Sequence, residues 1–142
     1  VLTYAGLTIE TVPSYEDVDD IGFIIRDSET GLSLLHMGDN TRYIDDFKEI
    51  QDIDYLFLAM GKMSLEDTIL FLKAVKPKYL IPMHYKPARG AFLPKHYSYP
   101  SPEDPDQYLS QLVRMIKDSG IETRMIVLNP GQTQDLISAK GE

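Results

Sequence analysis

The sequence predicts an α/β domain in which a mixed sheet is flanked by helices. Residues 1–40 contain short apolar runs separated by turn residues, which is typical of β-hairpins. Residues 41–136 alternate strand-like and helix-like patterns, which is typical of β-α-β units. At 142 residues the chain is long enough for one hydrophobic core. We therefore expect residues 1–142 to form a single domain with a frayed polar tail at 137–142.

The first strands are predicted by alternation and by turn chemistry. In residues 7–12, Leu7, Ile9 and Thr11 alternate with Thr8, Glu10 and Val12, and Pro13 ends this period-two pattern. Two apolar runs, 22–26 and 32–36, flank the Asp-Ser-Glu-Thr-Gly segment at 27–31. That segment has the composition of a hairpin turn, so the two runs are expected to pair.

The middle of the chain alternates helix and strand. A short helix is expected at 43–50, because Tyr43, Phe47 and Ile50 would share one face. Residues 54–60 are almost continuously apolar, as in a strand covered on both faces. Ser64 then caps a helix that Pro77 stops.

The last third repeats the pattern. Residues 78–83 form a strand whose Pro82 indicates that it ends there or lies near an edge. Asp104 with Pro105 begins a helix that Gly120 ends, followed by a final strand at 122–128. The inward stripe of that helix is expected to comprise Leu109, Leu112, Val113 and Ile116.

Composition excludes several classes of function. The formal charge of -8 and the pI near 4.8 argue against nucleic acid as the default partner. The absence of cysteine excludes disulfides and thiolate metal sites. No apolar run approaches the roughly 20 residues of a membrane span, and no signal-peptide pattern is present, which favours the cytoplasm. The chain starts at Val1 without an initiator Met, which hints at a longer or processed protein.

Two metal-competent side chains follow apolar strands. Asp39 ends the segment His36-Met37-Gly38-Asp39, and His84 ends Ile81-Pro82-Met83-His84. A carboxylate and an imidazole at neighbouring strand ends could share a divalent cation such as zinc or manganese. A catalytic zinc normally has three protein ligands, so this pair is incomplete. His36 is expected to point away from Asp39 and to pack or hydrogen-bond elsewhere.

These motifs resemble those of the metallo-β-lactamase-fold hydrolases, in particular the UlaG-like lactonase and hydrolase branch. The segment 34–40 is similar to their Gly-Asp strand motif, and 81–85 to their last metal-binding motif. Residues 12–16 resemble a segment that ends in a metal-binding His. The order of the motifs and the hairpin between the first two also agree. The resemblance implies the C-terminal half of an αββα sandwich.

The resemblance assigns roles to the matching residues. Asp39 would bridge two metals, and His84 would be the terminal ligand of the second. Glu16 stands where the family has His and is the candidate third ligand, whereas Asn40 stands where the family usually has Thr. The family's His-x-His-x-Asp-His motif is missing, because no histidine precedes His36. The implied partner is therefore a missing N-terminal half or a second subunit, which would cover the inner sheet face.

The resemblance also implies a reaction. Metal-bound water would cleave an ester, lactone or phosphodiester, with zinc, manganese or iron as the cofactor. We expect little or no activity from the isolated chain. Several of the metal ligands are missing from it, so its site can be without metal. A small-molecule substrate would be contacted by Tyr85 and by the long loop at 86–104. The candidate contacts in that loop are Lys86, Arg89 and His96.

The alternative is a non-catalytic relic of the fold that serves as a binding or assembly module. Glu16 in place of His favours this alternative. The retention of both Asp39 and His84 favours the hydrolase.

Overall fold

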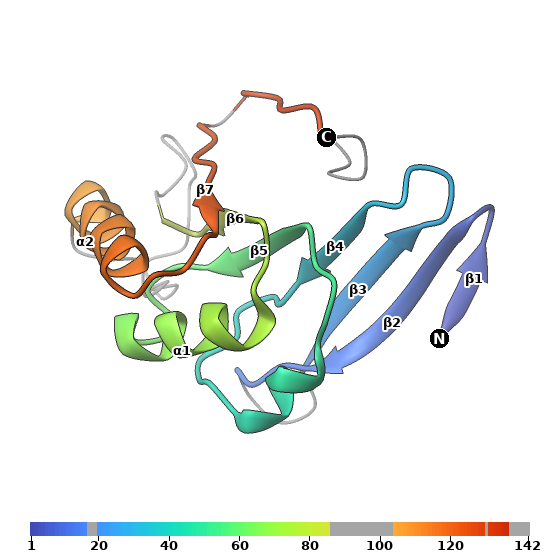
Figure 1. Cartoon of the computed structure of the whole chain (residues 1–142), viewed down its shortest axis with the longest axis horizontal. Helices are drawn as coiled ribbons and strands as arrows, with labels where there is room; N and C mark the ends of the chain where they lie inside the picture. Colours follow the sequence, from blue (N-terminus) through green and yellow to red (C-terminus); the bar gives the residue numbers. More distant parts are fainter. Residues whose placement is uncertain (17–19, 86–103, 130, 137–142) are drawn as a thin grey trace, which may run out of the picture.

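The computed structural model describes residues 1–16, 20–85, 104–129 and 131–136. Seven strands lie side by side in one sheet, in the same order as in the sequence (Figure 1). The elements are β1 (Leu2–Tyr4), β2 (Leu7–Pro13), β3 (Ile21–Asp27), β4 (Ser33–His36), the 3-10 helix η1 (Asp45–Glu49), β5 (Tyr55–Ala59), α1 (Leu65–Val75), β6 (Tyr79–Met83), α2 (Pro105–Asp118) and β7 (Arg124–Met125). The predicted mixed sheet with flanking helices is confirmed.

The sheet changes character at β4. Strands β1 to β4 pair antiparallel, whereas β4 to β7 pair parallel. Two reversals of direction separate β2 from β4, so β2 runs the same way as β4, β5 and β6. The carboxyl ends of these four strands therefore lie at one edge of the sheet.

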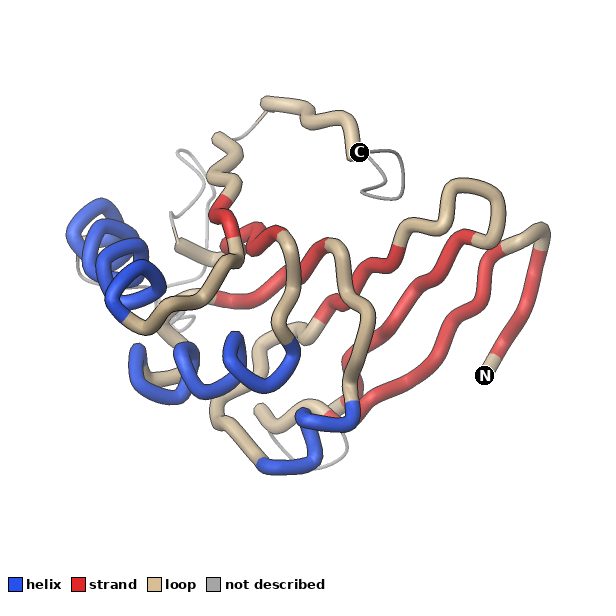
Figure 2. Tube along the Cα trace, in the orientation of Figure 1, coloured by secondary structure: helices blue, strands red, loops and turns tan. Residues whose placement is uncertain are grey.

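Helices η1, α1 and α2 contribute to one hydrophobic core with one face of the sheet (Figures 1 and 2). Alternate strand residues point into that core, and Leu35, Leu56 and Leu80 are completely buried. Phe71 of α1 and Phe47 of η1 meet edge to face between the elements, with ring centroids 4.8 Å apart. The core thus fixes the parallel half of the sheet most firmly.

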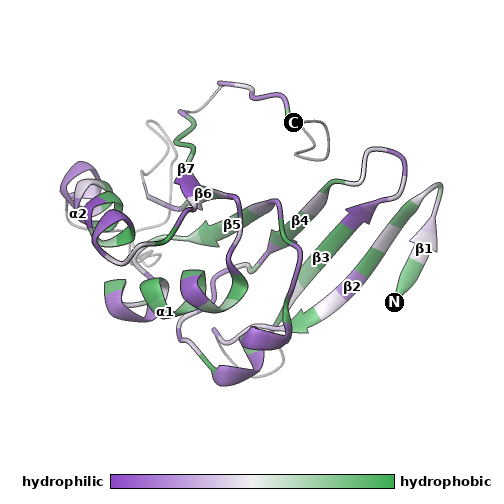
Figure 3. Ribbon diagram, in the orientation of Figure 1, coloured by the Kyte–Doolittle hydropathy of each residue, from purple (hydrophilic) through white to green (hydrophobic). Residues whose placement is uncertain are grey.

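The opposite face carries no helix of the described residues. A row of side chains crosses it in register, from Phe23 through His36 and Phe57 to Ile81. Phe23 is 38% exposed, and the rings of His36 and Phe57 are stacked. The face that carries Phe23, His36, Phe57 and Ile81 is called the helix-free face below. Figure 3 shows hydrophobic residues along β2 and β3, the part of the sheet that reaches beyond the helices.

Both predicted helix starts are confirmed. Ser64 accepts a hydrogen bond from the Asp67 amide at 3.0 Å, and Asp104 accepts from two amides of the first turn of α2. Gly120, with a φ of 67°, follows the end of α2.

Some sequence expectations were wrong in detail. The helix expected at 43–50 is the shorter 3-10 turn η1, although Phe47 and Ile50 are buried and Tyr43 packs against the core, as the shared face predicted. Val113 is 47% exposed, so it is not part of the inward stripe. Strand β1 was not expected, and the final strand is only β7 rather than 122–128.

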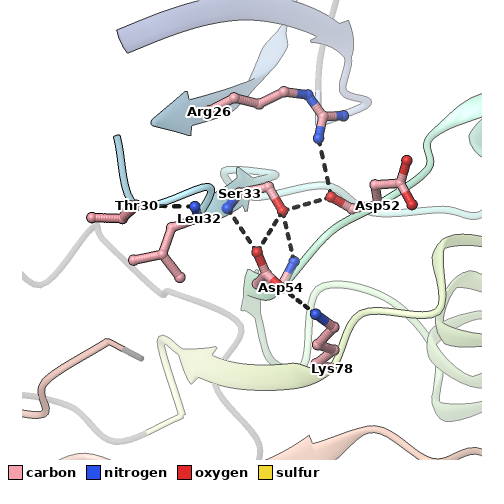
Figure 4. A network of polar contacts seen from close by, with 7 residues as sticks. All are labelled: Arg26, Thr30, Leu32, Ser33, Asp52, Asp54 and Lys78. Atoms are coloured by element: carbon pink, nitrogen blue, oxygen red, sulfur yellow. Dashed lines mark hydrogen bonds and ion pairs between the residues drawn. The ribbon is translucent and has the colours of Figure 1, made fainter. Parts of the chain in front are cut away.

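A polar network ties the strands together at the edge opposite the four carboxyl ends (Figure 4). The Asp54 carboxylate accepts hydrogen bonds from the Ser33 amide at 2.9 Å and from the Ser33 hydroxyl at 3.0 Å. It also accepts from Lys78 Nζ at 2.7 Å. These three residues lie at or just before the starts of β4, β5 and β6, so one carboxylate sets their relative position.

Candidate metal centre

Four charged or metal-competent side chains gather where β2, β4, β5 and β6 end. Glu16 follows β2, Asp39 follows β4, Lys62 follows β5 and His84 follows β6. The common direction of these strands brings the four side chains together although they span most of the described chain. Such strand ends are where open α/β sheets carry their ligands.

Asp39 is the centre of this cluster. His84 Nδ1 lies 3.0 Å from Asp39 Oδ1, and Lys62 Nζ lies 3.1 Å from Asp39 Oδ2. The Asp39 side chain is 17% exposed, whereas that of His84 is 41% exposed. The pair predicted from the sequence is therefore in direct contact, and the imidazole retains access to solvent.

Backbone geometry at the two strand exits aims these side chains. Gly38 has a φ of 59°, in the left-handed region that favours glycine, and turns the chain immediately before Asp39. His84 itself has a φ of 56°, which is uncommon for a residue with a side chain. A strained residue that turns a candidate ligand toward its partner is typical of functional sites.

The loop that carries Glu16 is hydrogen-bonded to the segment that follows β4. The Ser14 hydroxyl donates to the Met37 carbonyl at 2.7 Å, and the Tyr15 amide donates to Asn40 Oδ1 at 2.9 Å. Asn40 is completely buried, and its amide nitrogen donates to the Arg42 carbonyl. The departure at position 40 thus has a structural role, because Asn40 fastens the loop after β2 to the loop after β4.

Lys62 was missed by the sequence analysis. Its ammonium lies 2.6 Å from Glu16 Oε1 as well as next to Asp39, and its side chain is only 9% exposed. The hydrogen bond with Glu16 raises the pKa of Lys62, burial opposes that shift, and Asp39 adds to it. The ammonium is therefore charged at neutral pH. The signal that could have revealed it is the Gly61-Lys62 pair directly after an apolar strand, the position equivalent to Gly38-Asp39.

The arrangement fits a divalent cation only in part. Asp39 and His84 offer an oxygen and a nitrogen donor of the kind that zinc or manganese accepts. Glu16 instead faces an ammonium, and across the described ranges no three carboxylate or imidazole groups are placed to hold one ion. A third ligand would have to come from outside these residues.

The remaining predicted residues are placed as follows. His36 donates nothing to Asp39; its Nδ1 accepts from the Gly38 amide at 3.2 Å, as expected for a histidine that points elsewhere. Tyr85 is buried in the core, and its hydroxyl donates to the Leu128 carbonyl at 2.5 Å. A substrate contact by Tyr85 stays a prediction. Lys86, Arg89 and His96 lie outside the described residues.

Comparisons with solved structures show that the chain has a metallo-β-lactamase fold. A metallo hydrolase from Ignicoccus hospitalis superposes with a TM-score of 0.64 at 23% identity, covering 89% of this chain and 52% of that one. A diiron β-hydroxylase from Streptomyces venezuelae gives the same TM-score at 16% identity, covering 89% of this chain and 32% of that one. One fold thus carries different reactions, so the fold alone does not fix the chemistry.

The sequence profile of the beta-lactamase superfamily domain matches residues 1–84, and the chain belongs to that family. A UPF0173 metal-dependent hydrolase of Archaeoglobus fulgidus is 28% identical over 120 residues, which are 80% of this chain and 45% of the relative. A second, of Carboxydothermus hydrogenoformans, is 39% identical over 69 residues, which are 45% of this chain and 30% of the relative. The chain therefore spans less than half the length of these curated relatives. In the described part of the chain, no helix has the length and apolar character needed to cross a bilayer.

Proposed function

We propose that this chain supplies Asp39 and His84 to the metal centre of a hydrolase. The observation that carries the proposal is the contact between Asp39 Oδ1, after β4, and His84 Nδ1, after β6, in a chain whose relatives are metal-dependent hydrolases. Zinc, manganese or iron would fit the donor types. Such an ion supplies an acidic water as a nucleophile for an ester, lactone or phosphodiester.

The residues of this chain would hold and orient the reacting groups. Asp39 contributes a carboxylate, and His84 contributes an imidazole that stands on the solvent side of it. The Asn40 and Ser14 hydrogen bonds keep the surrounding loops in place, so the donor atoms need little reorganisation on binding.

We also propose that a further protein segment completes the site and covers the helix-free face. The exposed Phe23 and the stacked rings of His36 and Phe57 on that face support this proposal, because large exposed apolar patches usually mark an interface. The length of the relatives supports a missing half in the same polypeptide, and a second subunit is the other source. Activity would then require that segment.

Metal content of the purified protein tests the proposal. We expect a divalent ion to bind, and Asp39→Asn to weaken that binding by at least about tenfold. Asp118→Asn makes the same chemical change on the exposed end of α2 and should leave binding unaltered. If the protein folds well with the completing segment present and still binds no divalent ion, the hydrolase proposal is refuted and the binding or assembly module remains.

A further inference from the structure

Lys62 provides a fixed positive charge between two carboxylates of the candidate metal centre. Its Nζ is 2.6 Å from Glu16 Oε1 and 3.1 Å from Asp39 Oδ2. These distances are those of charge-assisted hydrogen bonds. Since the Lys62 side chain is 9% exposed, its stem is packed and its ammonium is held in this position.

The two sides of Asp39 therefore have different partners. Oδ1 faces His84, which can donate a lone pair to a metal, whereas Oδ2 faces an ammonium, which cannot. A carboxylate that bridges two ions with one oxygen on each needs both of its oxygens for metal. Here one oxygen is already committed to a cation that the chain itself provides.

Charge leads to the same conclusion. Glu16 and Asp39 carry two negative charges, and Lys62 cancels one of them. One dication at the Asp39–His84 side would be balanced by the remaining carboxylate charge and by ligands from elsewhere. A second dication on the Glu16 side would have to approach an ammonium at close range, which like-charge repulsion opposes.

We propose that the Lys62 ammonium occupies one of the two cation positions of the site, so that the protein binds a single divalent ion at Asp39 and His84. Glu16 is then the partner of Lys62 and not a metal ligand. This inference rests on the proposed function, because it needs a metal at Asp39 and His84. It adds that the centre is mononuclear and that Lys62 sets this number.

The test is a titration with Mn²⁺ alone, followed by electron paramagnetic resonance, which reports both the number of bound ions and any magnetic coupling between two of them. We expect the wild-type protein to bind one uncoupled ion per chain. Lys62→Met should bind a second ion, seen as a coupled signal, or bind the first at least ten times more tightly. Lys62→Gln, which keeps a polar group near the carboxylates, should change binding in the same direction and guards against loss of folding in the Met variant.

Lys73→Met is the matched control, because Lys73 is exposed on α1 and away from the cluster. It should leave the number of bound ions and the affinity unchanged. Two ions in the wild type, or Lys62 variants that match the wild type in number and affinity, overturn the mononuclear inference and leave the proposed function standing. With the completing segment present, absence of Mn²⁺ binding in the wild type and in every variant overturns both.

Discussion

Asp54→Ala tests whether one buried carboxylate organises the starts of the parallel strands. The substitution removes the acceptor of the Ser33 amide, the Ser33 hydroxyl and Lys78 Nζ. The hydroxyl can still donate to the Asp52 carbonyl, and Lys78 is half exposed and regains water. The buried Ser33 amide has no such substitute.

The expected loss is about 2–3 kcal/mol in the free energy of unfolding, because a hydrogen bond to a charged acceptor is lost and its buried donor is left unpaired. For a domain of this size the melting temperature should fall by roughly 10 °C, measured by circular dichroism. Lys78→Met should cost less than about 1 kcal/mol, since the Lys78 side chain is 49% exposed and its charge is screened.

The pH dependence gives a second readout. Burial raises the pKa of Asp54, but hydrogen bonds from Lys78 and Ser33 outweigh burial and lower the pKa below its ordinary value of 3.8. A lowered folded-state pKa means that the stabilisation is complete above the unfolded-state pKa and is lost as the pH falls through it toward the folded-state pKa. The difference between wild type and Asp54→Ala should therefore be constant near neutrality and shrink below about pH 4. This account is refuted if the unfolding free energy of Asp54→Ala lies within roughly 0.5 kcal/mol of wild type, which is the scatter of a surface change. It is also refuted if Lys78→Met destabilises the protein as much as Asp54→Ala does.

Two further substitutions separate packing from metal binding. Gly22→Ala should lower the free energy of unfolding in urea by about 1–3 kcal/mol, because the added Cβ would lie 2.8 Å from the His36 carbonyl oxygen and 3.0 Å from Val12 Cγ2. A variant as stable as the wild type would show that β2, β3 and β4 can move apart without loss of stability. His36→Gln should leave the metal content unchanged, since His36 stacks on Phe57 and accepts from the Gly38 amide; a large loss of bound metal would show that His36, not His84, is the ligand.

The sequence was sufficient for features with a local physical cause. Ser64 and Asp104 predicted helix starts because a capping side chain satisfies amides of its own first turn. Asp39 and His84 were expected to share a cation at neighbouring strand ends. Their side chains lie 3.0 Å apart, although β5 separates the two strands that they follow.

Features that depend on distant neighbours were missed. Strand β1 has only exposed residues, so no burial pattern marks it, and pairing with β2 alone defines it. Strand β7 is short because of a proline in its partner, β6. The Ile126 amide donates to the Leu80 carbonyl, but the next hydrogen bond between the two strands would need a backbone N–H at Pro82, which proline lacks. Val113 matched the helical period, yet only the tertiary packing of α2 decides how wide its buried stripe is.

Lys62 was not predicted, because an ammonium has no lone pair and therefore is not a candidate metal ligand. A lysine carries no metal-ligand signal in a sequence, and its two partners, Glu16 and Asp39, are far from it in the chain. Only the common direction of the strands brings these charges together.

The order of the strands has a consequence for how the chain folds. Every strand of the sheet pairs with the strand that comes next in the sequence, from β1 to β7. No strand pairs with one that lies several elements further along the chain. The entropy lost in closing the connecting loop is therefore small each time a strand joins the sheet. The sheet can therefore grow strand by strand as the polypeptide leaves the ribosome, with each new strand covering the edge exposed by the one before.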